Sequence, residues 1–131
     1  MDSSRFNTLW QRAGARNNST AAFAVLVDYY SESHRRYHTA RHVRDCLETY
    51  DSAIPVLGNN DAVEMALWFH DAVYIVGQTD NELCSAALFR SLSEGHLPSD
   101  FNDQVVRLIT ATQHNQAPTA ADEQFARDVD L

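Results

Sequence analysis

Apolar residues recur at intervals of three and four along most of the chain, the spacing that places them on one face of an α-helix. No stretch shows the alternation of apolar and polar residues that is typical of a half-buried strand. Helices are predicted over residues 4–13, 21–32, 39–52, 61–74, 80–94, 99–112 and 120–131. The pattern therefore predicts an all-α fold, a bundle of about six to seven helices in a single domain over residues 1–131.

Capping and helix-breaking residues between these segments predict where helices begin and end. Asp61 and Glu64 have the spacing of a capping box, and so do Thr79 and Glu82. Pro55 and Gly58 are expected to mark the loop after the third helix, and Gly77 the end of the fourth.

Composition narrows the range of partners. The chain has 131 residues, 44% of them hydrophobic, as expected of one ordinary globular domain. Its 18 acidic and 10 basic residues give a formal charge of −8, and every basic residue is Arg. The absence of Lys excludes a P-loop lysine and a Schiff-base lysine. The acidic balance argues against a nucleic-acid polymer as partner, while a small phosphorylated molecule remains compatible with a few arginines.

The two cysteines, Cys46 and Cys84, have no CxxC partner, so neither a zinc knuckle nor a redox motif is predicted. Buried free thiols in a reducing compartment are the expectation. No signal peptide and no run of apolar residues long enough to cross a membrane is seen, so we expect a cytoplasmic protein that makes no membrane contact.

Candidate chemistry centres on His70 and Asp71, which stand side by side in the otherwise apolar run of residues 67–74. Removing a carboxylate from water costs several kcal/mol unless something compensates its charge. A divalent cation is one such compensator, because imidazole and carboxylate are both good ligands. The simpler alternative is a core histidine beside an aspartate that reaches solvent.

Other candidate ligands lie far from this pair along the chain. His38 stands where the third helix begins, and His42 lies four residues later on the same helical face. For His42 we favour a supporting or surface position over direct ligation. Asp130, in the last helix, could supply a fourth ligand from a distant segment.

Four blocks of sequence occur in an order that resembles a known family. They are Arg35-Arg36-Tyr37-His38-Thr39 with His42-Val43, then residues 68–74, then Asp80-Asn81-Glu82 with Ser85-Ala86, and finally Asp128-Val129-Asp130-Leu131. Together they resemble the H…HD…D signature of the HD superfamily of metal-dependent phosphohydrolases, and in particular its small bacterial predicted phosphohydrolases. The resemblance spans roughly residues 9–131.

The resemblance implies a divalent metal (Mn, Mg, Co, Ni, Fe or Zn) held by His38, His70, Asp71 and Asp130. Such a metal would activate a water molecule for attack on phosphorus, with Asp71 also orienting that water. The substrate would be a small phosphorylated molecule such as a nucleotide.

Four further residues have expected roles with simpler alternatives. Arg35 and Arg36 are candidates for binding phosphate oxygens, or form a solvated loop. Glu82 is a candidate for proton transfer, or bonds back to Thr79 as a helix cap. His114 is a candidate for contacting substrate or a second metal, or is a free surface histidine.

The chain departs from the family pattern in two ways. Ile75 occupies a position where members often have aspartate, and members generally continue for several helices beyond the Asp-x-Asp-Leu block. These departures support an alternative function, a metal- or nucleotide-binding module without turnover. If part of the usual core is missing, exposed apolar surface would favour a homo-oligomer.

Overall fold

The computed structural model describes residues 1–35, 37–113 and 120–130. These residues form seven helices and no strand, which confirms the predicted all-α fold. The helices are α1 (Ser3–Arg12), α2 (Thr20–Tyr30), α3 (Ala40–Leu57), α4 (Asp61–Phe69), α5 (Asn81–Ser93), α6 (Ser99–Ala111) and α7 (Ala121–Asp130). In the described part of the chain, no helix combines the length and the apolar character needed to cross a membrane.

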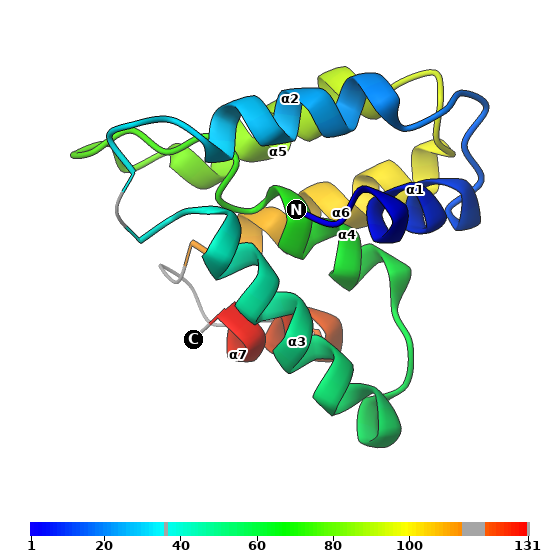
Figure 1. Cartoon of the computed structure of the whole chain (residues 1–131). Coiled ribbons are helices and arrows are strands. Elements are labelled where there is room, and N and C mark those ends of the chain that lie inside the picture. Colours follow the sequence, from blue (N-terminus) through cyan, green and yellow to red (C-terminus); the bar gives the residue numbers. More distant parts are fainter. Residues whose placement is uncertain (36, 114–119, 131) are drawn as a thin grey trace.

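Helix α4 is the centre of the bundle, because it packs against α3, α5, α6 and α7. In Figure 1, α2 and α5 lie at one side of the molecule, α3 and α7 at the opposite side, and α4 and α6 between them. Every residue from Ala62 to Phe69 is buried, which explains why this helix is apolar on nearly all its faces. The C-terminal end of α4 therefore lies in the interior, and the residues after Phe69 begin there.

Aromatic side chains join α1 and α2 to this central helix. The ring of Phe6 packs against Trp10, Phe23, Trp68 and Phe69 with centroid separations of 5.2–6.1 Å. Such offset and edge-on contacts add to the burial of large apolar surfaces. They fix the position of α4 relative to the N-terminal helices.

Helix α3 is longer than predicted. It runs through Pro55 to Leu57 and ends where Gly58 adopts a φ of +82°, whereas the prediction ended it near residue 52. Proline lacks the N–H that would bond to the carbonyl four residues earlier, so one bond is lost in the last turn. This end of α3 is exposed, with Val56 and Leu57 facing outward, which places the missing bond away from the core.

The start of α4 also differs from prediction. The cap is Asn60, whose side-chain oxygen accepts from the N–H of Val63 at 3.1 Å. Glu64 does not bond back as in a capping box; its carboxylate binds Arg5 at 3.3 Å and Arg12 at 3.5 Å. A tertiary ion pair has replaced the local interaction.

Candidate metal centre

The end of α4 is the feature that builds the site. The pattern predicted a helix continuing to Tyr74, but α4 ends at Phe69, and His70 is its C-terminal cap. Beyond it, side chains from other elements bond the backbone: Ser85 bonds both N–H and C=O of Val73, and Asn81 does the same for Ile75. These bonds satisfy backbone groups that a longer helix would have paired internally.

The last four carbonyls of α4 have no partner within the helix and are all satisfied by neighbours. Two of them accept backbone N–H groups, from His70 to Ala66 and from Ala72 to Phe69. The other two accept side-chain donors. The Tyr30 hydroxyl donates to the carbonyl of Trp68 at 2.8 Å, and Nδ1 of His70 donates to that of Leu67 at 2.8 Å.

This last bond sets the state of His70. A carbonyl only accepts, so Nδ1 of His70 carries the proton, and in the neutral ring Nε2 presents its lone pair. The side chain is 1% exposed, and Nε2 lies 2.8 Å from Oδ1 of Asp130 and 3.3 Å from Oδ2 of Asp71. A histidine that ligates a metal is typically fixed in this way, by a bond from its other ring N–H to a carbonyl or carboxylate.

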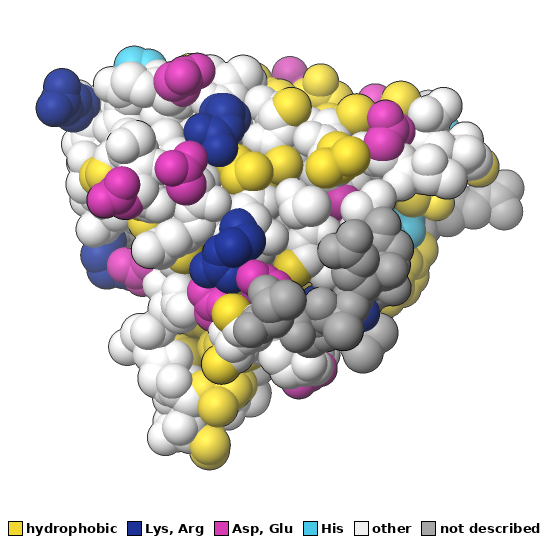
Figure 2. All heavy atoms as spheres, turned by 180° about the vertical axis from the view of Figure 1, so that it is seen from behind, with side chains coloured by type: hydrophobic (Ala, Val, Ile, Leu, Met, Phe, Trp, Pro, Cys, Tyr) yellow, Lys and Arg dark blue, Asp and Glu magenta, His cyan; other side chains and the backbone are white. Residues whose placement is uncertain are grey.

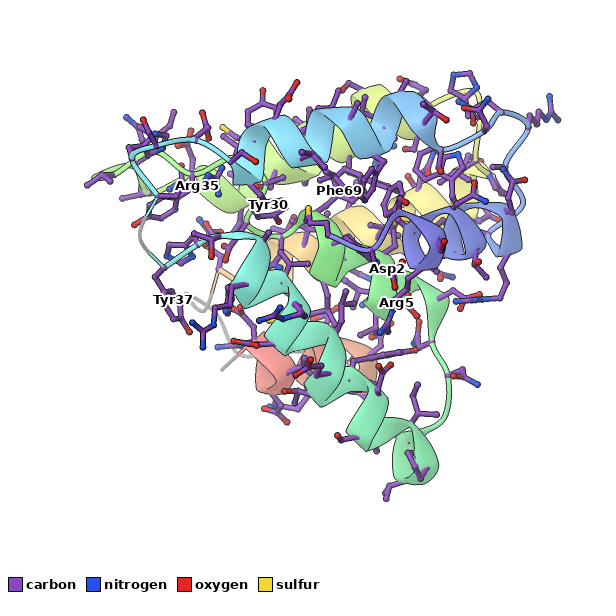
Figure 3. The ribbon with its side chains drawn as sticks, viewed as in Figure 1. Asp2, Arg5, Tyr30, Arg35, Tyr37 and Phe69 are labelled. Carbon is purple, nitrogen blue, oxygen red and sulfur yellow. The ribbon has the colours of Figure 1, made fainter. Side chains whose placement is uncertain are left out.

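Asp71 is held by its backbone as well as by its neighbours. Arg35 donates to the carbonyls of Asp71, Ala72 and His38, and its two remaining donors bind Glu32. The guanidinium is fully buried and lies over the ring of Tyr30 (Figure 3). All five donors of Arg35 are used inside the protein. The expected contact with substrate phosphate therefore does not fit this geometry: Arg35 is a positioning residue that ties residue 38 to residues 71–72.

Helix α7 brings the distant carboxylate. Oδ1 of Asp130 lies 2.8 Å from Nε2 of His70 and 3.2 Å from Nε2 of His42, which is 88 positions earlier in the chain. Nε2 of His42 is also 3.5 Å from Oδ2 of Asp71. His42 is thus buried in the cluster, whereas we had favoured a supporting or surface position.

Cys46 adds a thiol one helical turn after His42. Its sulfur lies 3.6 Å from Nε2 of His42. Ligand atoms from His42, Cys46, His70 and Asp130 all lie within 4.8 Å of one another, so this group could hold a metal ion. The sequence pattern predicts only a buried free thiol at Cys46. The available signal was its i, i+4 spacing from His42, which places both on one face of α3.

His38 occupies the edge of the cluster. Its Nδ1 lies 2.8 Å from Oδ2 of Asp71, and its ring packs against Tyr74 at a centroid distance of 4.1 Å. The side chain is 29% exposed, in contrast to His42 and His70. The structure thus brings His38, His70, Asp71 and Asp130 together. Direct ligation of a metal by His38 stays a prediction.

Electrostatics show that the cluster attracts positive charge. Hydrogen bonding to Asp130 and then to Cys46 raises the pKa of His42 to about 9, against the opposing effect of burial. Burial opposes protonation of His70, yet Asp71 and Asp130 together raise its pKa well above the ordinary value. Burial would raise the pKa of Asp71, but His70 and His38 hold it below the usual range.

The imidazole and carboxylate groups are spaced as two ligands of one cation would be. Ligand atoms about 2.0–2.2 Å from one ion lie roughly 3–3.5 Å apart. The imidazole-to-carboxylate distances of 2.8, 3.2, 3.3 and 3.5 Å cover that range. Nε2 of His70 faces two carboxylates and could donate one proton to only one of them, whereas a cation would satisfy all of these atoms together.

Three further expected residues remain to be placed. Arg36 and His114 lie outside the described residues. Glu82 is partly buried at the start of α5, and among the described residues it contacts neither the cluster nor Thr79. Its proton-transfer role stays a prediction, and the alternative helix cap does not form.

Comparisons with protein-family models, with curated proteins and with solved structures found no match. The site must therefore be interpreted from its own geometry.

Proposed function

We propose that the protein is a metal-dependent phosphohydrolase of the HD superfamily that cleaves a small phosphorylated molecule such as a nucleotide. One observation carries this proposal: two imidazole Nε2 atoms and two carboxylates, from α3, α7 and the end of α4, converge at ligand-to-ligand distances. Imidazole with carboxylate is a donor set suited to borderline and hard divalent ions.

His42, His70 and Asp130 would hold the cation together with Asp71, and the thiol of Cys46 is a further ligand within reach of the first three. A divalent ion bound there would lower the pKa of a water ligand and polarise a phosphoryl oxygen. The bonds from Arg35 to the carbonyls of Asp71 and Ala72 hold the backbone that carries the Asp71 carboxylate.

His38 is the residue best placed to move a proton. Its Nδ1 bonds Asp71, which orients the ring and leaves Nε2 as the exchangeable position. The side chain is the most exposed of the three clustered histidines, so it can reach a substrate in solvent. Its task would be protonation of the leaving oxygen.

The proposal is tested with purified protein and a panel of phosphomonoesters and nucleotides in the presence of Mn²⁺, Mg²⁺, Co²⁺ or Ni²⁺. Metal-dependent turnover is expected, and His42→Ala should abolish both turnover and metal binding. His96→Ala is the matched control, because His96 is exposed and lies outside the cluster. Turnover that survives His42→Ala would refute the proposal.

A second function is favoured by one observation: the Arg35 guanidinium has all five donors engaged inside the protein and so has none left for a phosphate. In this version the chain is a metal- and nucleotide-binding module without turnover. Metal and nucleotide bound in isothermal titration calorimetry, with no product from any substrate of the panel, would support this second function over the first.

A further inference from the structure

The candidate metal centre contains donors of three chemical kinds. His42 and His70 offer imidazole nitrogen, and Asp71 and Asp130 offer carboxylate oxygen. Cys46 adds sulfur, the softest donor of the five. Because metal ions differ in the donors that they prefer, the residues that ligate the ion also decide which ion is retained.

Helix α3 places the sulfur in the cluster. Cys46 follows His42 by one helical turn, and both side chains lie on the buried face of α3, which packs against α4 and α7. Cys46 is 2% exposed, and its sulfur lies 3.6 Å from Nε2 of His42. The thiol is therefore directed at the cluster and away from solvent.

The distance between sulfur and imidazole suits a tetrahedral ion. A zinc ion about 2.3 Å from sulfur and about 2.0–2.1 Å from nitrogen places these ligands roughly 3.5 Å apart, close to the observed 3.6 Å. Ligand atoms of four residues all lie within 4.8 Å of one another, so a bound ion would draw the most distant pair together by little more than about 1 Å. We call these four residues the sulfur set: His42, Cys46, His70 and Asp130.

Asp71 is the donor that the sulfur set leaves out. Its Oδ2 lies 3.3 Å from Nε2 of His70 and 3.5 Å from Nε2 of His42, yet Asp71 is not a member of the compact group of four. Replacing Cys46 by Asp71 gives a second group, the carboxylate set: His42, His70, Asp71 and Asp130. The two sets share three residues and differ in one ligand.

This one ligand changes the ion that is preferred. Thiolate sulfur favours zinc, whereas carboxylate oxygen suits Mg²⁺ and Mn²⁺. Mg²⁺ also requires octahedral oxygen ligation, which a buried sulfur does not supply. An ion that accepts Cys46 has four protein ligands, the number that a closed tetrahedral zinc site uses.

We propose that Cys46 gives this centre a second, zinc-selective mode: Zn²⁺ binds through the sulfur set, and harder ions such as Mn²⁺ bind through the carboxylate set. On zinc binding, the Cys46 thiol loses its proton to water and the thiolate takes the fourth tetrahedral position. The inference rests on the metal centre of the proposed function but not on turnover. Activation of water would belong to the carboxylate set, which leaves positions for water on a six-coordinate ion.

Co²⁺ is the probe for sulfur ligation, because it adopts the tetrahedral geometry of zinc and absorbs light. Metal-free protein is titrated with Co²⁺, and the near-ultraviolet spectrum is followed for the sulfur-to-cobalt charge-transfer band. The wild-type chain should show this band. The chain has two cysteines, so Cys84→Ser is the matched control: it alters a partly buried thiol on α5 outside the cluster and should keep the band.

Replacement of Cys46 tests the selectivity. Cys46→Ser should abolish the band and lower the affinity for Zn²⁺ at least about tenfold in calorimetric titration, since changes outside the ligand shell already cost about 10–100-fold. The affinity for Mn²⁺ should stay the same, because Mn²⁺ binds through the carboxylate set. Unchanged Mn²⁺ binding also shows that the variant is folded.

Several results would overturn the proposal. They are the absence of the band in wild type, its loss in Cys84→Ser, unchanged Zn²⁺ affinity in Cys46→Ser, or an equal loss of Zn²⁺ and Mn²⁺ affinity in a Cys46→Ser protein with wild-type circular dichroism. If Cys46→Ser does not fold, the spectra of wild type and Cys84→Ser decide, because Cys46 is then the remaining thiol. The proposed function fails separately: no turnover in a protein that shows the band would refute the hydrolase alone.

Discussion

Two nearly buried carboxylates lie near the two ends of the central helix α4 and have side-chain partners of different kinds. Glu64, in the first turn of α4, has a side chain that is 8% exposed and contacts Arg5 and Arg12. Asp71, just beyond the other end, is 12% exposed and contacts His38, His42 and His70. Burial is nearly equal, so the difference lies in the partners.

Glu64 belongs to a structural ion pair, whereas Asp71 belongs to a cluster whose protons can be exchanged. A guanidinium keeps its proton at any accessible pH, so the charge of Glu64 is permanently compensated. An imidazole can give up its proton and present a lone pair, so the protons around Asp71 can be exchanged for a metal ion. On the face seen in Figure 2, acidic and basic side chains are interspersed.

The largest expected effect is on metal binding at Asp71. Asp71→Asn keeps the shape of the side chain but removes its charge. Affinity for Mn²⁺ should fall by more than about 100-fold, because changes outside the ligand shell already cost 10–100-fold. Calorimetric titration measures this, with Asp103→Asn as the control, since Asp103 is exposed and pairs with Arg90. Unchanged affinity would remove Asp71 from the site.

The next effect is on stability. Arg35→Met should cost about 3–5 kcal/mol in the free energy of unfolding, because it leaves Glu32 and three backbone carbonyls without their donor. Urea denaturation measures the loss. The matched change Arg90→Met removes an exposed pair and should cost less than about 1 kcal/mol. Similar losses in both variants would show that Arg35 does not clamp the segment.

A smaller effect tests the other carboxylate. Glu64→Gln should destabilise the protein by about 1–3 kcal/mol, because two arginines lose a charged partner in a nearly buried setting. Metal affinity should stay the same, since Glu64 lies at the opposite end of α4 from His70. A drop in metal affinity would mean that the two ends are not independent.

The smallest effect concerns a more exposed pair. Arg107 bonds Asp122 at 2.7 Å and holds the pKa of that carboxyl below its usual value. The lowered pKa in the folded state means that the pair stabilises the protein at neutral pH. This stabilisation is lost as the pH falls from about 4 through the lower folded value. Asp122→Asn should therefore cost less than about 1 kcal/mol at pH 7, with the difference from wild type disappearing in stronger acid. A difference that grows on acidification would contradict this assignment.

Most helices could be predicted because their apolar spacing is a local property. The first two and last three begin and end within about two residues of the predicted positions. The end of α4 could not be predicted in the same way, because Arg35, Asn81 and Ser85 terminate it from distant positions. Apolar periodicity carries no information on such bonds.

In the candidate site, too, the contacts between residues far apart in the chain could not be predicted from the sequence. His70, Asp71 and Asp130 were selected from sequence and lie together in the structure. His42 was given a lesser place because its contact with Asp130 depends on how α7 docks against α3. Arg35 was given a substrate role because a sequence shows a guanidinium but not the carbonyls that occupy it.

The most direct test of the metal centre is an anomalous difference map from a crystal of the protein soaked in Mn²⁺. We expect one peak within coordinating distance, about 2–2.3 Å, of Nε2 of His42 and His70 and of the carboxylates of Asp71 and Asp130. A peak bound elsewhere, or no peak with these four side chains still in contact with one another, would contradict it.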